Sequence, residues 1–481
     1  MSRRSPQRAG HRAEAAGDVF VVPFVDEGLG NSAYLVGSRE AGTAALIDPL
    51  RDVDPYLVTA KRRGVDIAFA LDTHLHNDFL SGVREVAART GAAVGASAEA
   101  ELGFDHRPLR EGDRLDLGGH GLEVLATPGH TPEHIAFLLR GPRSDAPIAL
   151  YSGGALIVGG AARTDLLGDD ATEPLARKLY RTIHEKLLAL PDDVVVYPTH
   201  GAGSFCAAPT GEDRTTTIGL ERRRNRLATA RSEDEFVRLA LEGLPSYPAY
   251  FRALRPINRR GPSILGGVPT LVALPPRDVR AWLDGGGAVL DVRPARDFLQ
   301  GHIERAYGVP LEAPLVTWAG WLIPHGEPLV LVTEEVARRE EATRQLVRIG
   351  FDDLRGYLEG GMAAWVAARF PVERTPTVAP ADLRARLASA DAPVVIDVRR
   401  DDEWDQGHIP GAIHIQNGDL PAASLDLPKD RPIVVHCRTW NRSTSGLSVL
   451  ARRGFRNLAL LRGGLDAWEA AGLDLERDAR T

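Results

Sequence analysis

Cysteine is scarce in this chain, since only Cys206 and Cys437 occur among its 481 residues. Two thiols are too few for a disulfide framework, so we expect a reducing, cytoplasmic setting with free thiols. No apolar run approaches the roughly 18 residues that a membrane helix needs, which argues against a membrane protein. An excess of basic charge is also missing, because the formal net charge is -7. This argues against a nucleic-acid binder, which would usually present a basic face.

The first residues, 1–17, are polar and basic but have no apolar stretch behind them, so we interpret them as a disordered tail and not as a signal peptide. The rest of the chain is too long for one compact core. Strand-like runs followed by polar turns predict a first α/β domain over 18–265. The Gly- and Pro-rich "GGVPTLVALPP" marks a boundary, and two smaller domains are predicted over 270–372 and 376–478.

The two smaller domains are predicted from an internal repeat. "LDVRPARDFLQGHIERA", from Leu290, matches "IDVRRDDEWDQGHIPGA", from Ile396, and "LEGGMAAW" matches "LRGGLDAW". A nearly constant offset indicates two copies of one domain. Because each copy alternates apolar strand-like runs with helical segments, each is predicted to be a small α/β domain with a parallel sheet.

Cys437 lies in the second copy within "VVHCRTWNRSTSG", which predicts a buried strand, a tight loop and a helix. Inward-pointing backbone N–H groups and the helix dipole favour a thiolate in such a loop, as do Arg438 and Arg442. Ser443 closes the loop. The alternative is that Cys437 is a small buried hydrophobe. The basic loop favours a nucleophilic sulfur beside an anion site.

These motifs resemble the rhodanese family of sulfurtransferases, in which the loop cysteine carries a persulfide. Five positions separate Cys437 from Arg442, as in sulfur-transferring members, and Trp440 departs from the small residue found in many of them. The first copy has Thr333 at the cysteine position, followed by two glutamates. Because a hydroxyl without a base cannot carry sulfane sulfur and carboxylates repel anions, we expect this copy to be inactive and structural.

A second cluster lies in the first domain. "THLHND" contains His74, His76 and Asp78 after a strand-like run, "PGHT" contains His130, and "YPTHGAG" contains His200. A lone histidine is usually structural. Side chains of this kind at several strand ends favour a metal site.

These motifs resemble the metallo-β-lactamase superfamily, whose fold is an αββα sandwich. The similarity is strongest to its persulfide dioxygenase branch, particularly bacterial forms fused to two rhodanese domains, which share "HNDFLSG", "GAARTDLLG" and "THGAGSFC". The resemblance implies a mononuclear Fe(II) held by His74, His130 and an aspartate. It also implies a thiol persulfide and O₂ as substrates, in hydrogen sulfide and glutathione metabolism, and it suits a homo-oligomer.

The chain departs from that pattern at two positions. Gly154 stands where the branch has the aspartate, and Phe79 stands where two-metal hydrolases have a further histidine. Three outcomes stay open for the metal: His76 completes a three-histidine site, Asp78 or Asp165 substitutes, or the metal binds weakly or not at all. We expect a retained mononuclear site, with Fe(II) as the ion and Zn²⁺ as the other option.

The expected function is therefore a persulfide dioxygenase fused to a sulfurtransferase. It would oxidise thiol persulfides to sulfite and exchange sulfane sulfur with thiosulfate or sulfite through Cys437. The alternatives are a sulfurtransferase with an impaired first domain and, third, a zinc thioester hydrolase of the glyoxalase II type. Cys206 lies near the metal motifs or is simply a buried thiol. No site role is expected for His106, His120, His134 and His184.

Overall fold

A computed structural model describes residues 18–142, 146–207 and 211–477. The chain divides into two compact units, an N-terminal unit up to residue 247 together with 251–267, and a C-terminal unit of 248–250 and 268–481. The predicted tail lies outside the described residues. The finer domain boundaries given above stay predictions.

The first sheet of the N-terminal unit follows chain order from β1 to β6. Its first three strands pair antiparallel, and from β3 onward the neighbours are parallel. The bounds are β1 (Val19–Asp26), β2 (Asn31–Ser38), β3 (Thr43–Ile47), β4 (Asp66–Leu71), β5 (Ala93–Ser97) and β6 (Arg107–Leu109).

The second sheet has the order β12-β11-β10-β9-β8-β7. Only β10 and β11 pair parallel, and the other neighbours are antiparallel. The bounds are β7 (Arg114–Asp116), β8 (Gly121–Ala126), β9 (Ile135–Arg140), β10 (Pro147–Gly153), β11 (Val195–Pro198) and β12 (Thr216–Thr217).

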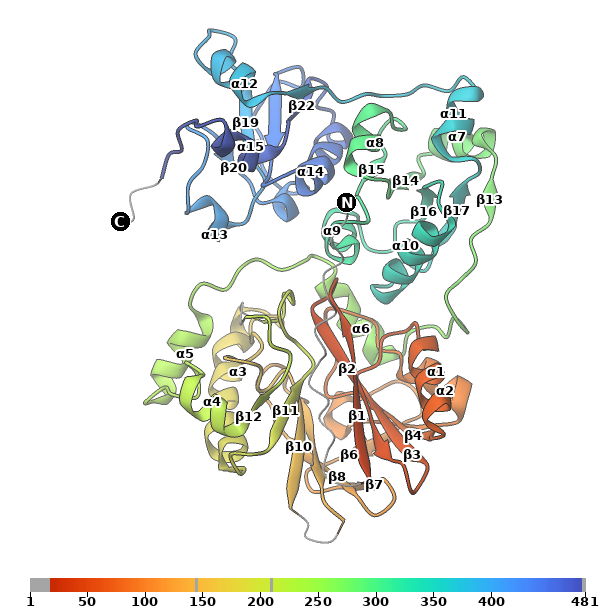
Figure 1. Cartoon of the computed structure of the whole chain (residues 1–481), viewed down its shortest axis with the longest axis vertical. Coiled ribbons are helices and arrows are strands. Elements are labelled where there is room, and N and C mark those ends of the chain that lie inside the picture. The colour runs from red at the N-terminus through yellow and green to blue at the C-terminus, as the bar shows by residue number, and fades with distance from the viewer. Residues whose placement is uncertain (1–17, 143–145, 208–210, 478–481) are drawn as a thin grey trace. The chain divides into compact units, whose positions relative to one another are not determined.

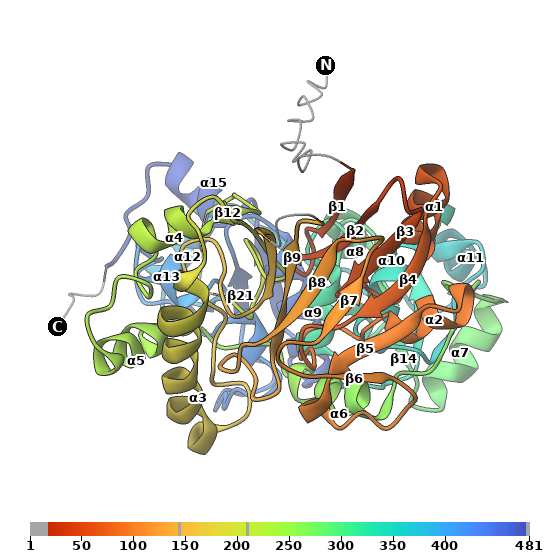
Figure 2. The ribbon, with the colours of Figure 1, turned by 90° about the horizontal axis from the view of Figure 1, so that it is seen from below.

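Helices cover the outer face of each sheet, as Figure 2 shows for α1 and α2 on one side and α3 on the other. The bounds are α1 (Asp54–Arg63), α2 (Val83–Thr90), α3 (Asp169–Arg181), α4 (Ile218–Arg224), α5 (Glu233–Leu241) and α6 (Phe251–Arg260). Helix α1 is formed by the segment "DPYLVTAKRR". It has a proline in its first turn and ends where Gly64 adopts a left-handed φ of 66°, which glycine does without a steric cost.

Three apolar clusters fill the spaces between these layers. The central one joins inward side chains of both sheets, such as Tyr34 and Phe137. A second joins the first sheet to Tyr56 of α1 and Val86 of α2, and a third joins the second sheet to Leu179 of α3. The unit is therefore an αββα sandwich, and the predicted fold is confirmed.

The C-terminal unit contains two five-stranded parallel sheets of the same topology, β13-β17-β16-β14-β15 and β18-β22-β21-β19-β20 (Figure 1). The first has β13 (Ala273–Leu274), β14 (Ala288–Asp291), β15 (Tyr307–Gly308), β16 (Leu329–Val332) and β17 (Leu354–Leu358). The second has β18 (Thr377–Val378), β19 (Val394–Asp397), β20 (Ile413–His414), β21 (Ile433–His436) and β22 (Leu458–Leu461). The identical strand order confirms two copies of a small parallel α/β fold.

Helices connect the parallel strands of each copy, because parallel neighbours need a crossover connection. The first copy has α7 (Pro276–Asp284), α8 (Ala295–Gln300), α9 (Leu315–Leu322), α10 (Val336–Arg348) and α11 (Gly361–Ala367). The second has α12 (Pro380–Leu387), α13 (Asp401–Trp404), α14 (Asn441–Arg452) and α15 (Gly464–Ala470).

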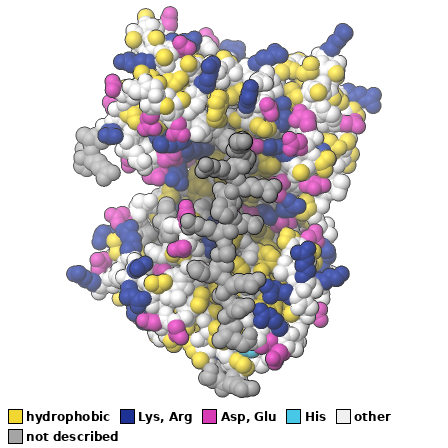
Figure 3. Space-filling view, in the orientation of Figure 1, with side chains coloured by type: hydrophobic (Ala, Val, Ile, Leu, Met, Phe, Trp, Pro, Cys, Tyr) yellow, Lys and Arg dark blue, Asp and Glu magenta, His cyan; other side chains and the backbone are white. Residues whose placement is uncertain are grey.

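In the part of the chain that the structure describes, no helix has the length and apolar character needed to cross a bilayer. On the surface in view in Figure 3, acidic and basic side chains are interspersed, in keeping with the modest net charge.

Candidate metal centre and thiol site

The histidine cluster forms where strands of both sheets end. His74 follows β4 of the first sheet, whereas His130 lies between β8 and β9 and His200 follows β11 of the second sheet. All three side chains are buried, with residue exposures between 0% and 4%. One ring nitrogen from each can be chosen so that all three lie within 4.8 Å of one another.

The outer ring nitrogens of these histidines are already hydrogen-bonded, which fixes the proton positions. His130 Nδ1 lies 2.6 Å from the carbonyl oxygen of Arg163, which can only accept, so this nitrogen carries the proton. His200 Nδ1 lies 3.0 Å from Asn31 Oδ1, and the Asn31 amide donates from its nitrogen to Asp78, so Oδ1 is again an acceptor.

His74 follows the same rule. Its Nδ1 lies 2.8 Å from Thr73 Oγ1, and that hydroxyl donates its only proton to Asp48 Oδ2 at 2.8 Å. The Thr73 oxygen therefore accepts from His74 Nδ1. In all three rings the proton sits on Nδ1, and the lone pair of Nε2 is left for a ligand.

The Nε2 atoms have the properties of metal ligands. His130 Nε2 is buried without a hydrogen-bond partner, and the Nε2 atoms of His74 and His200 face each other at 3.3 Å. Burial lowers the pKa of His130 and of His200 to about 3 and lowers that of His74 well below its usual value, so the rings are neutral. Three neutral imidazoles, each oriented through its other nitrogen, fit a single divalent metal ion.

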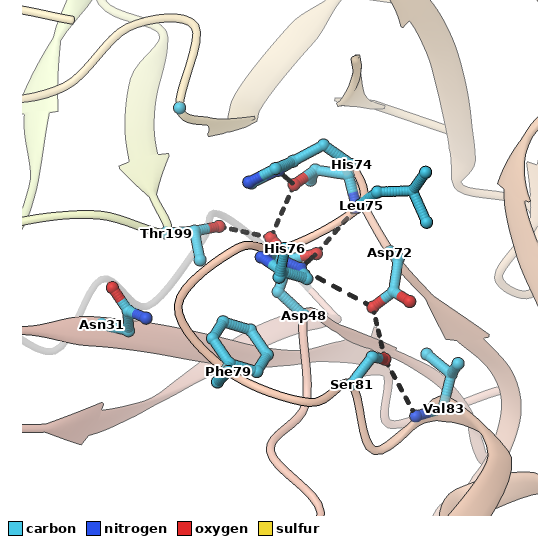
Figure 4. A network of polar contacts seen from close by, with 12 residues as sticks. Asn31, Asp48, Asp72, His74, Leu75, His76, Phe79, Ser81, Val83 and Thr199 are labelled. Carbon is cyan, nitrogen blue, oxygen red and sulfur yellow. Dashed lines mark hydrogen bonds and ion pairs between the residues drawn. The ribbon is translucent and has the colours of Figure 1, made fainter. Parts of the chain in front are cut away.

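His76 lies beside this cluster in a buried polar network that also reaches His74, through Asp48 and Thr73 (Figure 4). Its Nε2 lies 3.3 Å from Asp48 Oδ1 and 3.8 Å from Asp72 Oδ1. Burial opposes protonation, but the Asp48 carboxylate raises the pKa of His76 above its usual value. Burial raises the pKa of Asp72 to about 7. His76 could also form a metal-binding group with Asp48 and His74, or with Asp78 and His200. Its Nε2, however, already faces the Asp48 carboxylate.

Asp48 organises the strand ends that carry the candidate ligands, although it was not among the predicted site residues. It accepts hydrogen bonds from the Thr73 backbone N–H at 2.7 Å, from the Thr73 hydroxyl and from the Thr199 hydroxyl. These threonines directly precede His74 and His200. The available signal was an aspartate at the end of the strand-like run "AALID", the same setting that identified the histidines.

The carboxylates considered as substitute ligands lie in different places. Asp78 Oδ2 accepts from Asn31 at 2.6 Å and lies 3.5 Å from Nδ1 of His200, on the outer side of that ring. Asp165 forms a two-pronged ion pair with Arg163, with both N···O distances at 2.6 Å. Within the described residues, no group of metal-binding geometry contains Asp165.

Both positions that depart from the family pattern are tightly packed against neighbouring side chains. The Phe79 ring is fully buried and stacks on His76 with the ring centroids 4.1 Å apart. At Gly154, an added Cβ would lie 2.7 Å from His130 Cδ2 and 2.9 Å from Ala162 Cβ. A carboxylate at position 154 would therefore require the His130 ring to move.

His134 lies within the cluster, although the sequence offered no role for it. Its ring stacks on His74 with centroids 4.9 Å apart. Its Nδ1 bonds to the Thr127 hydroxyl at 2.8 Å, and its Nε2 accepts from the Gly154 N–H at 3.0 Å. Because both nitrogens are engaged, His134 supports the loop at position 154 and is not a ligand.

Cys206 is fully buried, and burial raises the pKa of its thiol well above the usual value. It therefore stays protonated near neutral pH, and no metal-binding group among the described residues includes it.

The second site surrounds Cys437, which lies between β21 and α14 and is 2% exposed. Its Sγ lies 3.5 Å from Ser443 Oγ, and that hydroxyl donates to the Trp440 carbonyl at 2.9 Å. Arg442 donates two hydrogen bonds to Glu403, one of them at 2.8 Å.

The two predicted loop arginines thus differ in their surroundings. Arg442 is partly buried, and its charge is shared with Glu403. Arg438 points into a more exposed region, where it pairs with Asp466 at 2.8 Å and with Glu469 at 3.8 Å. Acidic partners therefore offset both positive charges of the loop.

In the first copy, Thr333 occupies the corresponding place, and its buried hydroxyl has no hydrogen-bond partner among the described residues. The Glu334 carboxylate accepts from the Met362 N–H at 3.2 Å, at the start of α11. The loop after Thr333 therefore carries a carboxylate, whereas the corresponding loop of the second copy carries Arg438 and Arg442.

Comparisons with known proteins agree with this division. A metallo-β-lactamase superfamily model matches residues 26–200, and a rhodanese-like domain model matches 275–368 and 379–471. The mitochondrial persulfide dioxygenase ETHE1 of Homo sapiens is 32% identical over 188 residues, which are 38% of this chain and 68% of that protein. The hydroxyacylglutathione hydrolase of Polaromonas sp. is 40% identical over 174 residues, 35% of this chain and 62% of that protein.

Among solved structures, a metallo-β-lactamase from Staphylococcus aureus aligns with 71% of this chain and 99% of its own, with 30% identity and a TM-score of 0.63. The aligned share of this chain is larger than residues 26–200, the range that the metallo-β-lactamase superfamily model matches. The chain belongs to the metallo-β-lactamase superfamily and joins a domain homologous to persulfide dioxygenases to two rhodanese-like domains.

Proposed function

We propose that this protein oxidises thiol persulfides to sulfite with O₂ in its N-terminal unit and transfers sulfane sulfur through Cys437 in its C-terminal unit. The observation that carries the first half is the convergence of three Nε2 lone pairs from His74, His130 and His200. The similarity to persulfide dioxygenases supports the choice of substrate.

These three histidines would hold one Fe(II). The bound ion would supply redox chemistry and coordination positions for the persulfide sulfur and O₂. The overall reaction balances as one persulfide, one O₂ and one water giving one thiol, one sulfite and two protons. The chain's own part is to keep the imidazoles neutral and aligned and, because the site is buried, to limit the access of bulk water.

The second half rests on Cys437 and its loop. A thiolate or sulfite would attack the outer sulfur of a Cys437 persulfide, forming a new S–S bond. The bond between that sulfur and Sγ would break, and its electron pair would remain on Sγ. With sulfite as the acceptor the product is thiosulfate. Fusion of the two sites raises the local concentration of sulfite near this persulfide.

The deciding experiment loads the purified chain with Fe(II) under anaerobic conditions, adds glutathione persulfide and follows O₂ uptake and sulfite. Uptake that is lost in His130→Ala and kept in Cys437→Ser supports the proposal. With the iron site fully occupied, an absence of uptake would rule out the dioxygenase half and leave a sulfurtransferase.

A second candidate is a thioester hydrolase, favoured by the 40% identity to a hydroxyacylglutathione hydrolase. The phenylalanine at position 79 counts against it, because a second metal ion loses a ligand there. Hydrolysis of S-lactoylglutathione by the zinc-loaded chain, with two zinc ions bound per chain, would favour this candidate instead.

A further inference from the structure

Helix α6 contacts the loops that carry the candidate metal ligands. Its buried residues Phe251, Leu254 and Asn258 recur three and four positions apart, so they share one face of the helix. The metallo-β-lactamase superfamily model matches residues 26–200, so α6 lies outside the matched part of the chain. The family match therefore assigns this helix no role at the metal centre.

Asn258 holds the loop that follows His74, part of which Figure 4 shows. Its Nδ2 donates to the carbonyl oxygens of His76 and Phe79, each at 2.8 Å, and its Oδ1 accepts from the Ser81 N–H at 2.9 Å. Because carbonyls only accept and an N–H only donates, these partners fix the orientation of the amide. Asn258 is 4% exposed, so its removal would take a partner from backbone groups in a buried place.

Arg255 of the same helix joins this loop to the loop that carries His130. Its guanidinium donates to both carboxylate oxygens of Glu133, at 3.1 and 2.7 Å. The Leu75 backbone contacts both charges, since its N–H donates to Glu133 at 2.9 Å and its carbonyl accepts from Arg255 at 3.3 Å. Leu75 is the residue after His74. Glu133 lies three residues after His130. One ion pair therefore links ligand loops that follow strands of different sheets.

The pair between Glu133 and Arg255 is ionised although it is largely buried. The two side chains are 2% and 12% exposed. Burial opposes ionisation of the Glu133 carboxyl, but its hydrogen bonds with Arg255 lower its pKa below the usual value. Removal of one partner from a buried pair leaves an unpaired charge, which is strongly unfavourable. The pair therefore holds the two loops together more firmly than an exposed ion pair would.

Helix α6 in turn depends on these contacts. It has ten residues, and Pro256 lies inside it. An isolated helix of this length is marginal in water, and an internal proline removes one of its hydrogen bonds. Docking on the ligand loops therefore stabilises the helix, while the helix stabilises the loops.

We propose that α6 is a clamp on the metal centre, in which Arg255 and Asn258 are positioning residues that hold the His74 loop and the His130 loop at the spacing that one divalent ion requires. The inference rests on the proposed metal-dependent function and deepens it. The clamp and the ion favour the same arrangement of the loops. Docking of α6 therefore strengthens metal binding, and metal binding strengthens the docking of α6 by the same factor.

The first test measures the Zn²⁺ Kd of the full chain by chelator competition. Arg255→Met and Asn258→Asp should raise the Kd about 2- to 30-fold, the range for residues that couple to a site without contacting its ligand. Asn258→Asp keeps the size of the side chain but cannot donate to the two carbonyls. Arg255→Lys keeps a positive charge and should recover part of the affinity. The matched control is Arg252→Met, on the exposed side of the same helix, which should bind Zn²⁺ like the wild type.

Hydrogen exchange followed by mass spectrometry provides the second test, because it reports on α6 itself. In the wild type, Zn²⁺ should slow the exchange of amides in 251–260 and in 74–81. Helix α5 of the same unit is the reference for a general stabilisation, and its exchange should slow less. The inference is overturned if Zn²⁺ slows exchange in 251–260 no more than in α5, or if the wild type binds no Zn²⁺.

The variants separate positioning from a general loss of stability. If Arg255→Met and Asn258→Asp are folded, have a lower Tm and still bind Zn²⁺ like Arg252→Met, the clamp is refuted. Neither test needs turnover. If both tests give the expected result and the Fe(II)-loaded chain takes up no O₂, the proposed dioxygenase function fails and the clamp stands.

Discussion

The sharpest prediction concerns His200, the proposed third metal ligand in place of the family's carboxylate. His200→Ala removes one of the three Nε2 lone pairs that converge at the candidate centre. The neighbouring carboxylate, Asp78, lies 3.5 Å from the opposite nitrogen of this ring and cannot take its place without a rearrangement. We therefore expect the remaining two histidines to bind a divalent ion much more weakly.

The magnitude follows from the hydrogen bonds behind the ligands. Loss of an outer partner of a ligating histidine typically weakens metal binding about 10- to 100-fold. Asn31→Ala removes such a partner, since Asn31 Oδ1 lies 3.0 Å from His200 Nδ1, and should fall in that range. Loss of the ligand itself should cost more, so we expect His200→Ala to weaken binding by at least about 100-fold.

The assay is a competition titration of Co(II) or Zn²⁺ against a chelator, after circular dichroism has shown that each variant is folded. His184→Gln is the control, because this histidine lies in the same unit and bonds to the Leu227 carbonyl, away from the cluster. His76→Gln tests the competing ligand set. If His200→Ala binds metal like the control while His76→Gln loses it, the assignment of His200 is refuted and His76 is the third ligand.

Three further predictions concern other parts of the chain. Cys437→Ser should abolish sulfur transfer while leaving the metal content measured by atomic absorption unchanged. Asp48→Asn should destabilise the N-terminal unit by about 3–5 kcal/mol in urea unfolding, because it neutralises a buried carboxylate that faces His76 and accepts hydrogen bonds from Thr73 and Thr199; an effect below about 1 kcal/mol would contradict this. Burial opposes ionisation of Glu403, but its contacts with Arg442 lower its pKa to about 2. Its contribution to stability is therefore present above its usual pKa and is lost as the pH falls toward 2. Over that pH interval the Tm of Glu403→Gln should depend less on pH than the Tm of the wild type. Parallel curves of Tm against pH for the two proteins would contradict this prediction.

The fold was largely predictable because its signals are local and repeated. The segments that begin at Leu290 and at Ile396 share motifs in the same order. This repeat predicts that both copies have the same strand topology, and the prediction needs no knowledge of long-range contacts. Similarly, proline in the first turn of α1 and Gly64 after its last turn give the bounds of that helix from sequence alone. The predicted tail at 1–17 has no such test within the described residues.

The site was less predictable, because choosing among ligands depends on which partner each ring nitrogen finds. The sequence places His76 two residues from His74, a spacing for which strand alternation predicts that both side chains point the same way. The two rings do lie side by side, with centroids 4.1 Å apart, but Asp48 lies 3.3 Å from the Nε2 of His76. The roles of Asp48 and His134 depend on contacts with Thr199 and Gly154, which are distant in the sequence, and no periodic pattern signals such contacts.

The substitution at Gly154 has a physical consequence for how the first unit should be understood. Loss of a carboxylate from a buried site would leave a space lined by polar groups without partners, which lowers the stability of the fold. Here the space is taken by the His130 ring and Ala162, and the Gly154 N–H is satisfied by His134. The space around the glycine is therefore filled, and one ring nitrogen from each of the three histidines lies within 4.8 Å of the other two. A unit that had merely lost its site would have no reason to keep three buried, neutral imidazoles oriented in this way, so the geometry favours a metal centre with an altered ligand set.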